Sequence, residues 1–259
     1  MDLGIKGKQS IVCASSKGLG KACAAALLRE GCDVVINARD EATLQATAEE
    51  LAQLGGGQVT TVAGDLNTQE GRAKLLEACP NPDILVNNNA GPPPGAFDKW
   101  VEADWQAALQ ANLLAPVFMI QGVLPGMRQR KFGRIVNITS AMVKSPHAAM
   151  GLSTTARSGL TALCKGLSNE CVADNVTINN LLPERFDTDR QKQMANLMMQ
   201  TQGISYEEAR IAIASTIKAK RFGEPAEFGD ACAYLCSAQA GFISGQNLQL
   251  DGGSYAGLI

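Results

Sequence analysis

The sequence has little of what marks a nucleic-acid, membrane or metal-binding protein. Its 259 residues carry 23 Lys and Arg against 25 Asp and Glu, so no excess of positive charge points to nucleic acid or to an anionic membrane. No apolar run approaches the roughly 18 residues of a membrane span. The eight cysteines fall singly in apolar segments, without a CxxC pair or another metal-ligand spacing, which indicates reduced thiols. We therefore expect a cytoplasmic protein with no nucleic-acid, membrane or metal partner.

Short apolar runs alternate with longer amphipathic segments along the chain. The runs expected to form strands are Ser10–Ala14, Asp33–Ala38, Gln58–Ala63, Asp83–Asn88, Arg134–Thr139, Val176–Leu182 and Asn247–Leu250. They are apolar throughout, as expected for strands covered by helices on both faces. The alternation predicts one Rossmann-type α/β domain over residues 1–259, a doubly wound parallel sheet of about seven strands that binds ligands beyond the carboxyl ends of the strands.

One segment, Phe186 to Lys220, interrupts this alternation with two helical patterns between the last two strands. Its apolar positions are Met194, Leu197, Met198 and Met199 in the first pattern and Ala209, Ile213 and Ile217 in the second. Two interpretations stay open. The helices cap the core, or they form a substrate lid, since the insertion follows the carboxyl end of a strand.

A glycine-containing turn follows the first predicted strand and leads directly into a helix of small residues, Lys21 to Arg29. The turn reads Ala14-Ser15-Ser16-Lys17-Gly18-Leu19-Gly20. Gly18 and Gly20 allow the backbone to approach a pyrophosphate closely and to place it at the N-terminus of the helix. In this strand-turn-helix context the turn predicts a dinucleotide site.

The end of the second predicted strand indicates which dinucleotide is bound. An NAD site places a carboxylate there for the adenosine ribose hydroxyls, but this chain has Ala38 followed by Arg39, with Lys17 available from the glycine turn. Two cations without a carboxylate suit a 2′-phosphate, which accepts charge-assisted hydrogen bonds. We therefore expect NADP(H). The alternative is that both cations are solvated surface charges.

Further motifs follow in order: Gly64-Asp65-Leu66, Asn87-Asn88, Asn112, Ile138-Thr139-Ser140 and Leu250-Asp251-Gly252-Gly253. With the glycine turn, they make the chain resemble a short-chain dehydrogenase/reductase over essentially its whole length. The resemblance implies that Asp65 binds the adenine, that Asn112 holds a proton-relay water and that Ser140 binds the substrate oxygen. The cofactor residues that it adds are Asp65, Leu66, Asn87, Asn88, Asn89, Pro183, Phe186 and Thr188. It also implies a small-molecule substrate and a homotetramer.

Three positions depart mildly from the family pattern. Ala14 stands in place of the first glycine of the turn, and Glu184 stands where a glycine usually follows Pro183. The usual Asn-Asn-Ala-Gly is stretched to Asn87-Asn88-Asn89-Ala90-Gly91. These changes predict an altered pocket that still holds its cofactor.

The larger departure is the absence of the family's Tyr-x-x-x-Lys. Aligning the helix by Gly159-Leu160 puts Ser153 at the tyrosine position and Arg157 at the lysine position. A tyrosine phenol, with a pKa of ~10 lowered by lysine, protonates a carbonyl oxygen, whereas a serine hydroxyl is far too weak an acid. Arg157 can still hold the cofactor ribose and stabilise negative charge. The predicted site therefore favours electrostatics over proton transfer.

Other proton donors are scarce. The loop before Ser153 carries Lys144 and His147, the only histidine, which has a suitable intrinsic pKa. Each is equally explained as an ordinary surface residue. The tyrosines are Tyr206, Tyr234 and Tyr255, of which the first and last are weaker candidates.

Two classes of function remain open. The first is an NADPH-dependent reductase of a small carbonyl or a conjugated enone. The stretched asparagine loop, Lys144-x-Pro146 and Thr188-Asp189-Arg190 are similar to those of conjugate (ene) reductases of the bacilysin-pathway type, while 3-oxoacyl carrier-protein reductases represent the carbonyl reductases. The second is a catalytically silent NADPH-binding sensor whose lid engages a partner. Asn112 and Ser140 favour the enzyme.

Overall fold

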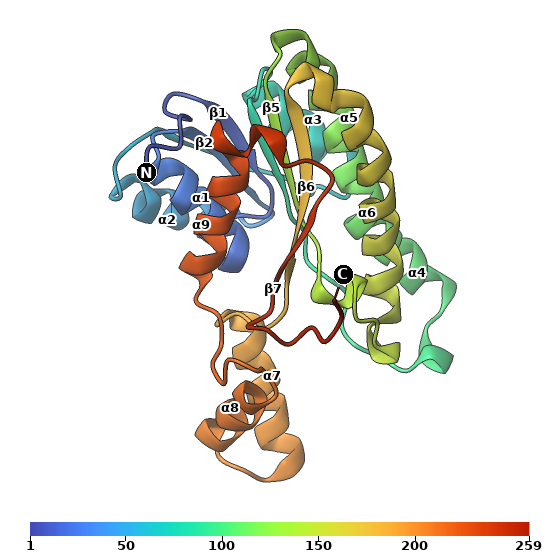
Figure 1. Ribbon diagram of the computed structural model, residues 1–259. Helices are drawn as coiled ribbons and strands as arrows, with labels where there is room; N and C mark the ends of the chain where they lie inside the picture. Colours follow the sequence, from blue (N-terminus) through green and yellow to red (C-terminus); the bar gives the residue numbers. More distant parts are fainter. Residues whose placement is uncertain (259) are drawn as a thin grey trace.

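The computed structural model describes residues 1–258 and places the predicted strands in one parallel sheet (Figure 1). Its order is β3-β2-β1-β4-β5-β6-β7. The strands are β1 (Gln9–Val12), β2 (Asp33–Ala38), β3 (Val59–Ala63), β4 (Ile84–Asn87), β5 (Gly133–Ile138), β6 (Val176–Pro183) and β7 (Asn247–Leu250). The fold class is confirmed, and each predicted strand lies within a residue or two of the observed one.

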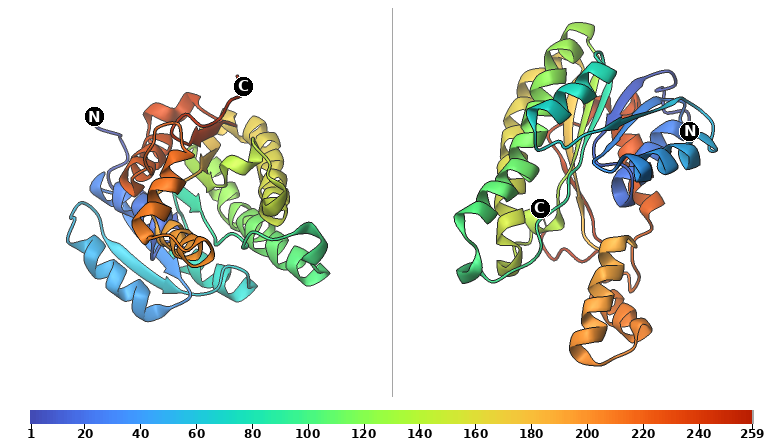
Figure 2. Two further views of the ribbon diagram at one scale, coloured as in Figure 1. Left: turned by 90° about the horizontal axis from the view of Figure 1, so that it is seen from below. Right: turned by 180° about the vertical axis from the view of Figure 1, so that it is seen from behind.

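Helices cover both faces of the sheet (Figure 2). On one face lie α1 (Gly18–Arg29), α2 (Glu41–Ala52) and α9 (Pro225–Cys236), and on the other lie α3 (Gln69–Ala78), α5 (Ala115–Arg130) and α6 (Gly151–Cys171). Neighbouring strand residues point to opposite layers, so Val12 packs into the first cluster and Ile11 into the second. The two clusters together form the core of the fold.

The expectation that every strand is covered on both faces is wrong for the two edge strands. The five inner strands are almost wholly buried, whereas β3 and β7 expose part of each strand. An edge strand has a neighbour on one side only, and fewer helices pack over it. The sequence pattern records apolar content and does not reveal the position of a strand in the sheet.

α4 (Glu102–Leu109), a π-helical turn (Gln110–Leu114) and α5 form one continuous helix, Glu102–Arg130. By length and mean hydropathy alone this helix is long and apolar enough to cross a membrane, although polar residues such as Gln110 and Asn112 interrupt its apolar runs. Its apolar side chains include Met119, Ile120 and Val123, which are buried against the sheet. A core helix of this kind has the same composition as a membrane span.

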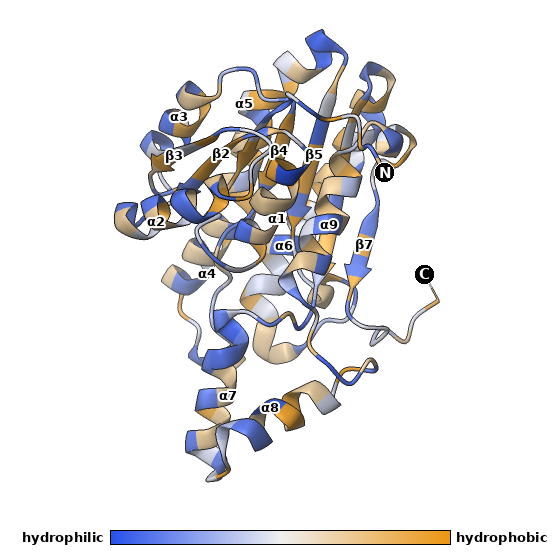
Figure 3. Ribbon diagram, turned by 90° about the vertical axis from the view of Figure 1, so that its left-hand side faces the viewer, coloured by the Kyte–Doolittle hydropathy of each residue, from blue (hydrophilic) through white to orange (hydrophobic). Residues whose placement is uncertain are grey.

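The insertion forms α7 (Asp189–Gln202) and α8 (Tyr206–Ser215), which project away from the carboxyl end of the sheet (Figures 1 and 2). They pack around a separate cluster of Ala195, Ala209, Ile213, Ile217 and Phe222. The predicted stripe on the second helix is thus confirmed. Figure 3 shows the polar surface of α7, on which Met194 and Leu197 are exposed. The interpretation that these helices cap the main core is wrong.

Candidate functional site

Two clefts lie at the carboxyl ends of the strands. The β2 cleft, of about 260 Å³, follows β2 and β3, and the β5 cleft, of about 510 Å³, follows β5 and β6. They are continuous, since Ala14, Lys17, Asn89 and Ala90 line both. The predicted residues at the β2 cleft are Ser16, Lys17, Ala38, Arg39, Asp65, Leu66 and Asn89. Those at the β5 cleft are Lys17, Gly18, Leu19, Asn88, Asn89, Ser140, Ser153, Arg157, Pro183, Phe186 and Thr188.

The glycine turn has the backbone geometry that the sequence predicts. Gly18 has a φ of 56°, and Ala14, at the position of the family's first glycine, also lies in the left-handed region with a φ of 45°. A Cβ on Gly20 would stand 2.5 Å from the Ala14 carbonyl oxygen, so only glycine fits there. Thr188, at the start of α7, lies over Gly18. The turn and the insertion therefore face each other across the β5 cleft.

Three predicted cofactor residues, Ser15, Gly20 and Asn87, are buried behind the clefts and do not line them. The Ser15 hydroxyl donates to the Val12 carbonyl at 2.6 Å and accepts from the Asn37 amide at 3.0 Å. Gly20 serves the close packing of the turn. Asn87 donates to the Asn137 side chain at 2.9 Å, the first step of a buried row that continues through Asn180 and Asn247. The side chains of Ser15 and Asn87 thus shape the strand ends and do not line either cleft.

The β2 cleft suits a phosphate group. Arg39 and Lys17 both line it and are exposed. The nearby Asp40 carboxylate accepts a hydrogen bond from the Thr43 amide at 2.8 Å and caps α2. Hydrogen bonds from Thr43, with a smaller contribution from Lys17, lower the pKa of Asp40. Because this carboxylate serves as a helix cap, the two cations are left to face a ligand.

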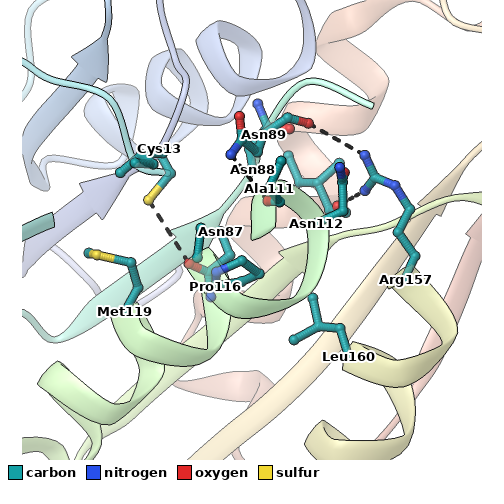
Figure 4. A pocket seen from close by; sticks show the side chains of 13 residues that line it. Cys13, Asn87, Asn88, Asn89, Ala111, Asn112, Pro116, Met119, Arg157 and Leu160 are labelled. Carbon is teal, nitrogen blue, oxygen red and sulfur yellow. Dashed lines mark hydrogen bonds between the residues drawn. The ribbon is translucent and has the colours of Figure 1, made fainter. Parts of the chain in front are cut away.

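Arg157 lines both the β5 cleft and the small pocket drawn in Figure 4. Its guanidinium donates to the carbonyls of Ile138 at 2.6 Å, Thr139 at 2.9 Å and Asn89 at 3.4 Å, and its Nε donates to Ser153 Oγ at 3.2 Å. Four N–H groups are thus used, and one remains for a ligand. All four partners are uncharged oxygens. Within residues 1–258, the site therefore contains a buried cation that is held in place without a carboxylate partner.

Burial lowers the pKa of Arg157 to about 10, and the neighbouring Arg190 adds to this effect. The side chain is only 8% exposed. It still carries its charge near neutral pH, because that pKa lies well above neutrality. Arg157 thus provides positive charge that does not depend on pH over the physiological range.

Asn112 lies in the π-helical turn of the long helix, and its side chain is buried. Its amide donates to the Ala90 carbonyl at 3.3 Å, while its Oδ1 has no hydrogen-bond partner among the described residues. An internal cavity of about 20 Å³ adjoins both Asn112 and Arg157 (Figure 4). That volume suffices for one water molecule. A water held by Asn112 stays a prediction that this geometry accommodates.

The structure does not bring Lys144 and His147 to either cleft. Lys144 Nζ lies 5.4 Å from the ring centroid of Tyr255, and the exposed His147 caps a short helical turn by accepting from the Ala149 amide. Neither Tyr206 nor Tyr255 lines a cleft. Ser140 does line the β5 cleft, where its hydroxyl accepts from the Met142 amide at 3.2 Å.

Glu184 and Gln191 also line the β5 cleft, and the sequence reasoning assigned neither a role. The only signal for Glu184 was its place in a position where the family has glycine. Gln191 is 6% exposed, and its Oε1 has no hydrogen-bond partner in residues 1–258. Nothing in its helical pattern distinguishes it from a surface residue. Glu184 lies just after β6, and Gln191 lies in the first turn of α7.

A protein-family model described as enoyl-(acyl carrier protein) reductase matches residues 13–255 of the chain. The chain belongs to the short-chain dehydrogenase/reductase family. The resemblance in the ordered motifs is therefore confirmed. Among curated members of the family, the NADPH-dependent reductase BacG of Bacillus subtilis is 33% identical over 95% of this chain and 97% of its own length. The 3-oxoacyl-[acyl-carrier-protein] reductase FabG of Vibrio cholerae is 28% identical over 98% of this chain and 99% of its own.

Solved structures of this short-chain dehydrogenase/reductase family have the same fold. L-sorbose reductase from Gluconobacter frateurii, in complex with NADPH and L-sorbose, superposes with a TM-score of 0.94 at 29% identity, with both chains wholly covered. YwfH, an NADPH-dependent reductase involved in bacilysin biosynthesis, gives 0.90 at 31% identity and covers 98% of this chain and 100% of its own.

Proposed function

We propose that this chain is an NADPH-dependent reductase of a small, conjugated enone. The observation that carries the proposal is Arg157, a buried cation fixed beside Ser140 and without a carboxylate partner. With Ser153 at the position of the family's tyrosine, the cleft has fixed positive charge but lacks the usual phenol. Such a site suits a reaction in which negative charge develops on an oxygen before any proton arrives.

The two clefts fit the phosphorylated dinucleotide. Lys17 and Arg39 would hold its 2′-phosphate, and Gly18 at the N-terminus of α1 would receive the pyrophosphate. Thr188 lies beside that turn, where its hydroxyl can bind the same part of the cofactor. The names of BacG and of the L-sorbose reductase complex, both of which specify NADPH, support this choice. Bound NADPH supplies the hydride for the reduction.

The side chains of the β5 cleft would act on the substrate oxygen. Ser140 donates a hydrogen bond to that oxygen, and the charge of Arg157 stabilises the enolate that forms. Removing one such donor typically slows a reaction about 10²- to 10³-fold. An enolate does not require a proton on oxygen in the same step, whereas reduction of a simple ketone does. This difference favours the conjugated substrate.

Two alternatives rest on other observations. L-sorbose reductase and FabG support reduction of an isolated carbonyl, which needs an acid in the cleft. The lack of a tyrosine among the residues that line the β5 cleft supports a catalytically silent NADPH-binding protein instead. The retained Asn112 and Ser140 favour an enzyme over a sensor.

Oxidation of NADPH, followed with an enone, its saturated ketone and no substrate, separates these functions. We expect the enone to be reduced fastest. Faster turnover of the ketone would contradict conjugate reduction, and no turnover across a wide panel would favour the sensor. Ser140→Ala should slow the enone reaction about 10²- to 10³-fold. The matched control is Ser145→Ala, on the exposed part of the same loop, which should leave the rate unchanged.

The alignment of Ser153 and Arg157 with the missing pair has its own test. The double variant Ser153→Tyr with Arg157→Lys should gain ketone reductase activity while it still binds NADPH. A variant that binds NADPH but gains no ketone activity would show that the pair is wrongly placed.

A further inference from the structure

The proposed reduction leaves one chemical requirement unmet, since the reduced substrate must still gain a proton. Of the residues that line the β5 cleft, Lys17 carries an ammonium group and Asp189 and Glu184 carry carboxyl groups, and these are the candidates for a proton donor. Lys17 belongs to the glycine turn and also lines the β2 cleft, which Ser140 does not. The Asp189 side chain is 62% exposed and pairs with Lys192 at 3.3 Å. Glu184 is the remaining candidate.

We propose that Glu184 is the proton donor of the reductase. Its position follows from the sheet register, because Ile138 of β5 pairs with Leu181 of β6 and the Thr139 amide donates to the Leu181 carbonyl at 2.9 Å. Continuing that register places Ser140 opposite Pro183, at the spacing of about 5 Å between neighbouring strands. Glu184 is the next residue, and it lines the same β5 cleft as Ser140.

Backbone pairing fixes this residue in place. The Glu184 amide donates to the Leu250 carbonyl at 3.2 Å, which joins the end of β6 to the end of β7. Phe186, two residues later, is buried against the Phe228 ring of α9 at a centroid distance of 5.2 Å. Glu184 is thus held at both sides. The helices of the insertion, α7 and α8, begin only after this segment.

The surroundings of the carboxyl group favour its protonated form. Partial burial is the largest effect and raises the pKa of Glu184, and the Asp251 carboxylate raises it further. Arg185 and the hydroxyl of Ser254 oppose this shift. Across the cleft stand the cations Lys17, Arg157 and Arg190, with Asp189 beside the last of them. The negative charge of a bound NADPH adds to the effect of Asp251.

The proton transfer balances without a further reactant. Hydride addition at the conjugated carbon leaves an enolate whose electron pair forms a new C–H bond at the carbon next to the carbonyl. The O–H bond of the Glu184 carboxyl group breaks, and its electrons remain on the carboxylate. The carboxylate then regains a proton from solvent. The products are the saturated ketone, NADP⁺ and the regenerated acid.

Glu184→Gln tests this inference, since glutamine keeps the size of the side chain but supplies no proton. With NADPH and an enone that the wild type reduces, we expect kcat to fall about 10²- to 10⁴-fold while NADPH still binds. The wild-type rate should decline as the pH rises through the Glu184 pKa, and the variant should lack this decline. In heavy water the wild type should add deuterium to one face of the carbon, and the variant to both.

The inference and the proposed function fail in different ways. An active wild type with an unchanged Glu184→Gln rate and pH profile overturns the inference and leaves the function standing. A wild type that reduces neither enone nor ketone overturns both. Independently of turnover, carbon-13 NMR of the NADPH complex should show a pKa for Glu184 above the ordinary 4.5. A value at or below 4.5 overturns the inference as well.

Two further variants locate the acid. Ser254→Ala removes a hydrogen bond that stabilises the Glu184 carboxylate, so the decline in rate should move to higher pH. Asp189→Asn removes the other carboxyl group of the cleft and should keep the decline where it is. A decline that disappears in Asp189→Asn assigns the proton to Asp189 and contradicts the inference.

Discussion

The β2 cleft and the β5 cleft differ in what builds them. The β2 cleft is lined largely by backbone and small residues at the ends of β1, β2 and β3, together with the exposed cations Lys17 and Arg39. The second depends on large side chains from β5, α6 and the segment after β6. Backbone geometry required by the fold keeps the first cleft close to the family pattern. Side chains can be exchanged more freely, and the β5 cleft is where the sequence predicts the larger departure from the family pattern.

Not every side chain of the β5 cleft can be exchanged freely, because Arg157 also supports the fold. It donates to the buried carbonyls of Ile138 and Thr139 and to the part-buried carbonyl of Asn89, where β5, the loop after β4 and α6 meet. Arg157 is therefore part of the structure of the β5 cleft. The two clefts can be compared by how strongly substitutions of their lining residues change stability or cofactor binding.

The largest effect is expected for Arg157→Met, which keeps much of the volume but leaves the carbonyls of Ile138, Thr139 and Asn89 without their donor. An unsatisfied buried polar group costs about 1–3 kcal/mol, so the free energy of unfolding should fall by about 2–4 kcal/mol. Denaturant unfolding measures this loss. Arg221→Met is the matched control, since its exposed pair with Glu227 should contribute much less. Equal losses would show that Arg157 is no part of the structural framework.

The sequence predicted the first cleft better than the second for a physical reason. The strand, the glycine turn and the cations Lys17 and Arg39 lie within short stretches of chain, and local pattern determines their arrangement. The contacts of Arg157 join residues 18, 19 and 68 positions apart. Their partners are backbone carbonyls, which leave no mark in the sequence. A role in binding was predicted for Arg157, but its anchoring was not.

Some predicted site residues lie near a cleft in the chain, but their side chains point away from it. Lys144 and His147 stand in a loop that borders the second cleft, yet one side chain contacts Tyr255 and the other caps a helical turn. Ser15 has the right place in the turn but points into the sheet. The sequence marked Glu184 only as a residue that replaces the family's usual glycine. Its proposed role depends on the pairing of β5 with β6, which places the end of β6 at the β5 cleft. Residue type and order do not specify these orientations.

In the first cleft, Arg39→Ala should weaken NADPH binding about tenfold to a hundredfold. This corresponds to a charge-assisted hydrogen bond of about 1.5–3 kcal/mol. Binding of NADH, which lacks the 2′-phosphate, should change little. Titration of each cofactor against both proteins measures the difference. Arg29→Ala, on the far end of α1, is a control that removes a cation outside the β2 cleft. Equal losses for the two cofactors would refute the phosphate assignment.

A smaller effect is expected at Ala14, the departure within the backbone-built first cleft. Its φ of 45° costs a non-glycine residue about 1–2 kcal/mol, whereas glycine adopts it freely but loses about 0.4–1 kcal/mol through its flexible unfolded state. Ala14→Gly should therefore raise the free energy of unfolding by up to about 1 kcal/mol. Ala52→Gly, at the exposed end of α2, should lower it. A loss at both positions would show that Ala14 is not strained.

The smallest effect concerns the pH dependence of stability at Glu184. Its pKa is raised in the folded protein, so its contribution to stability is present below the ordinary value of 4.5 and is lost as the pH rises through the folded value. Glutamine does not ionise, and Glu184→Gln should therefore raise Tm near neutral pH but not below pH 4.5. Glu227→Gln has the opposite sign, because hydrogen bonds from Arg221 lower the pKa of Glu227 to about 2. Its loss of Tm at neutral pH should disappear as the pH falls toward that value. A Glu184→Gln protein whose Tm follows the wild type at every pH would show that the second cleft does not favour the protonated acid.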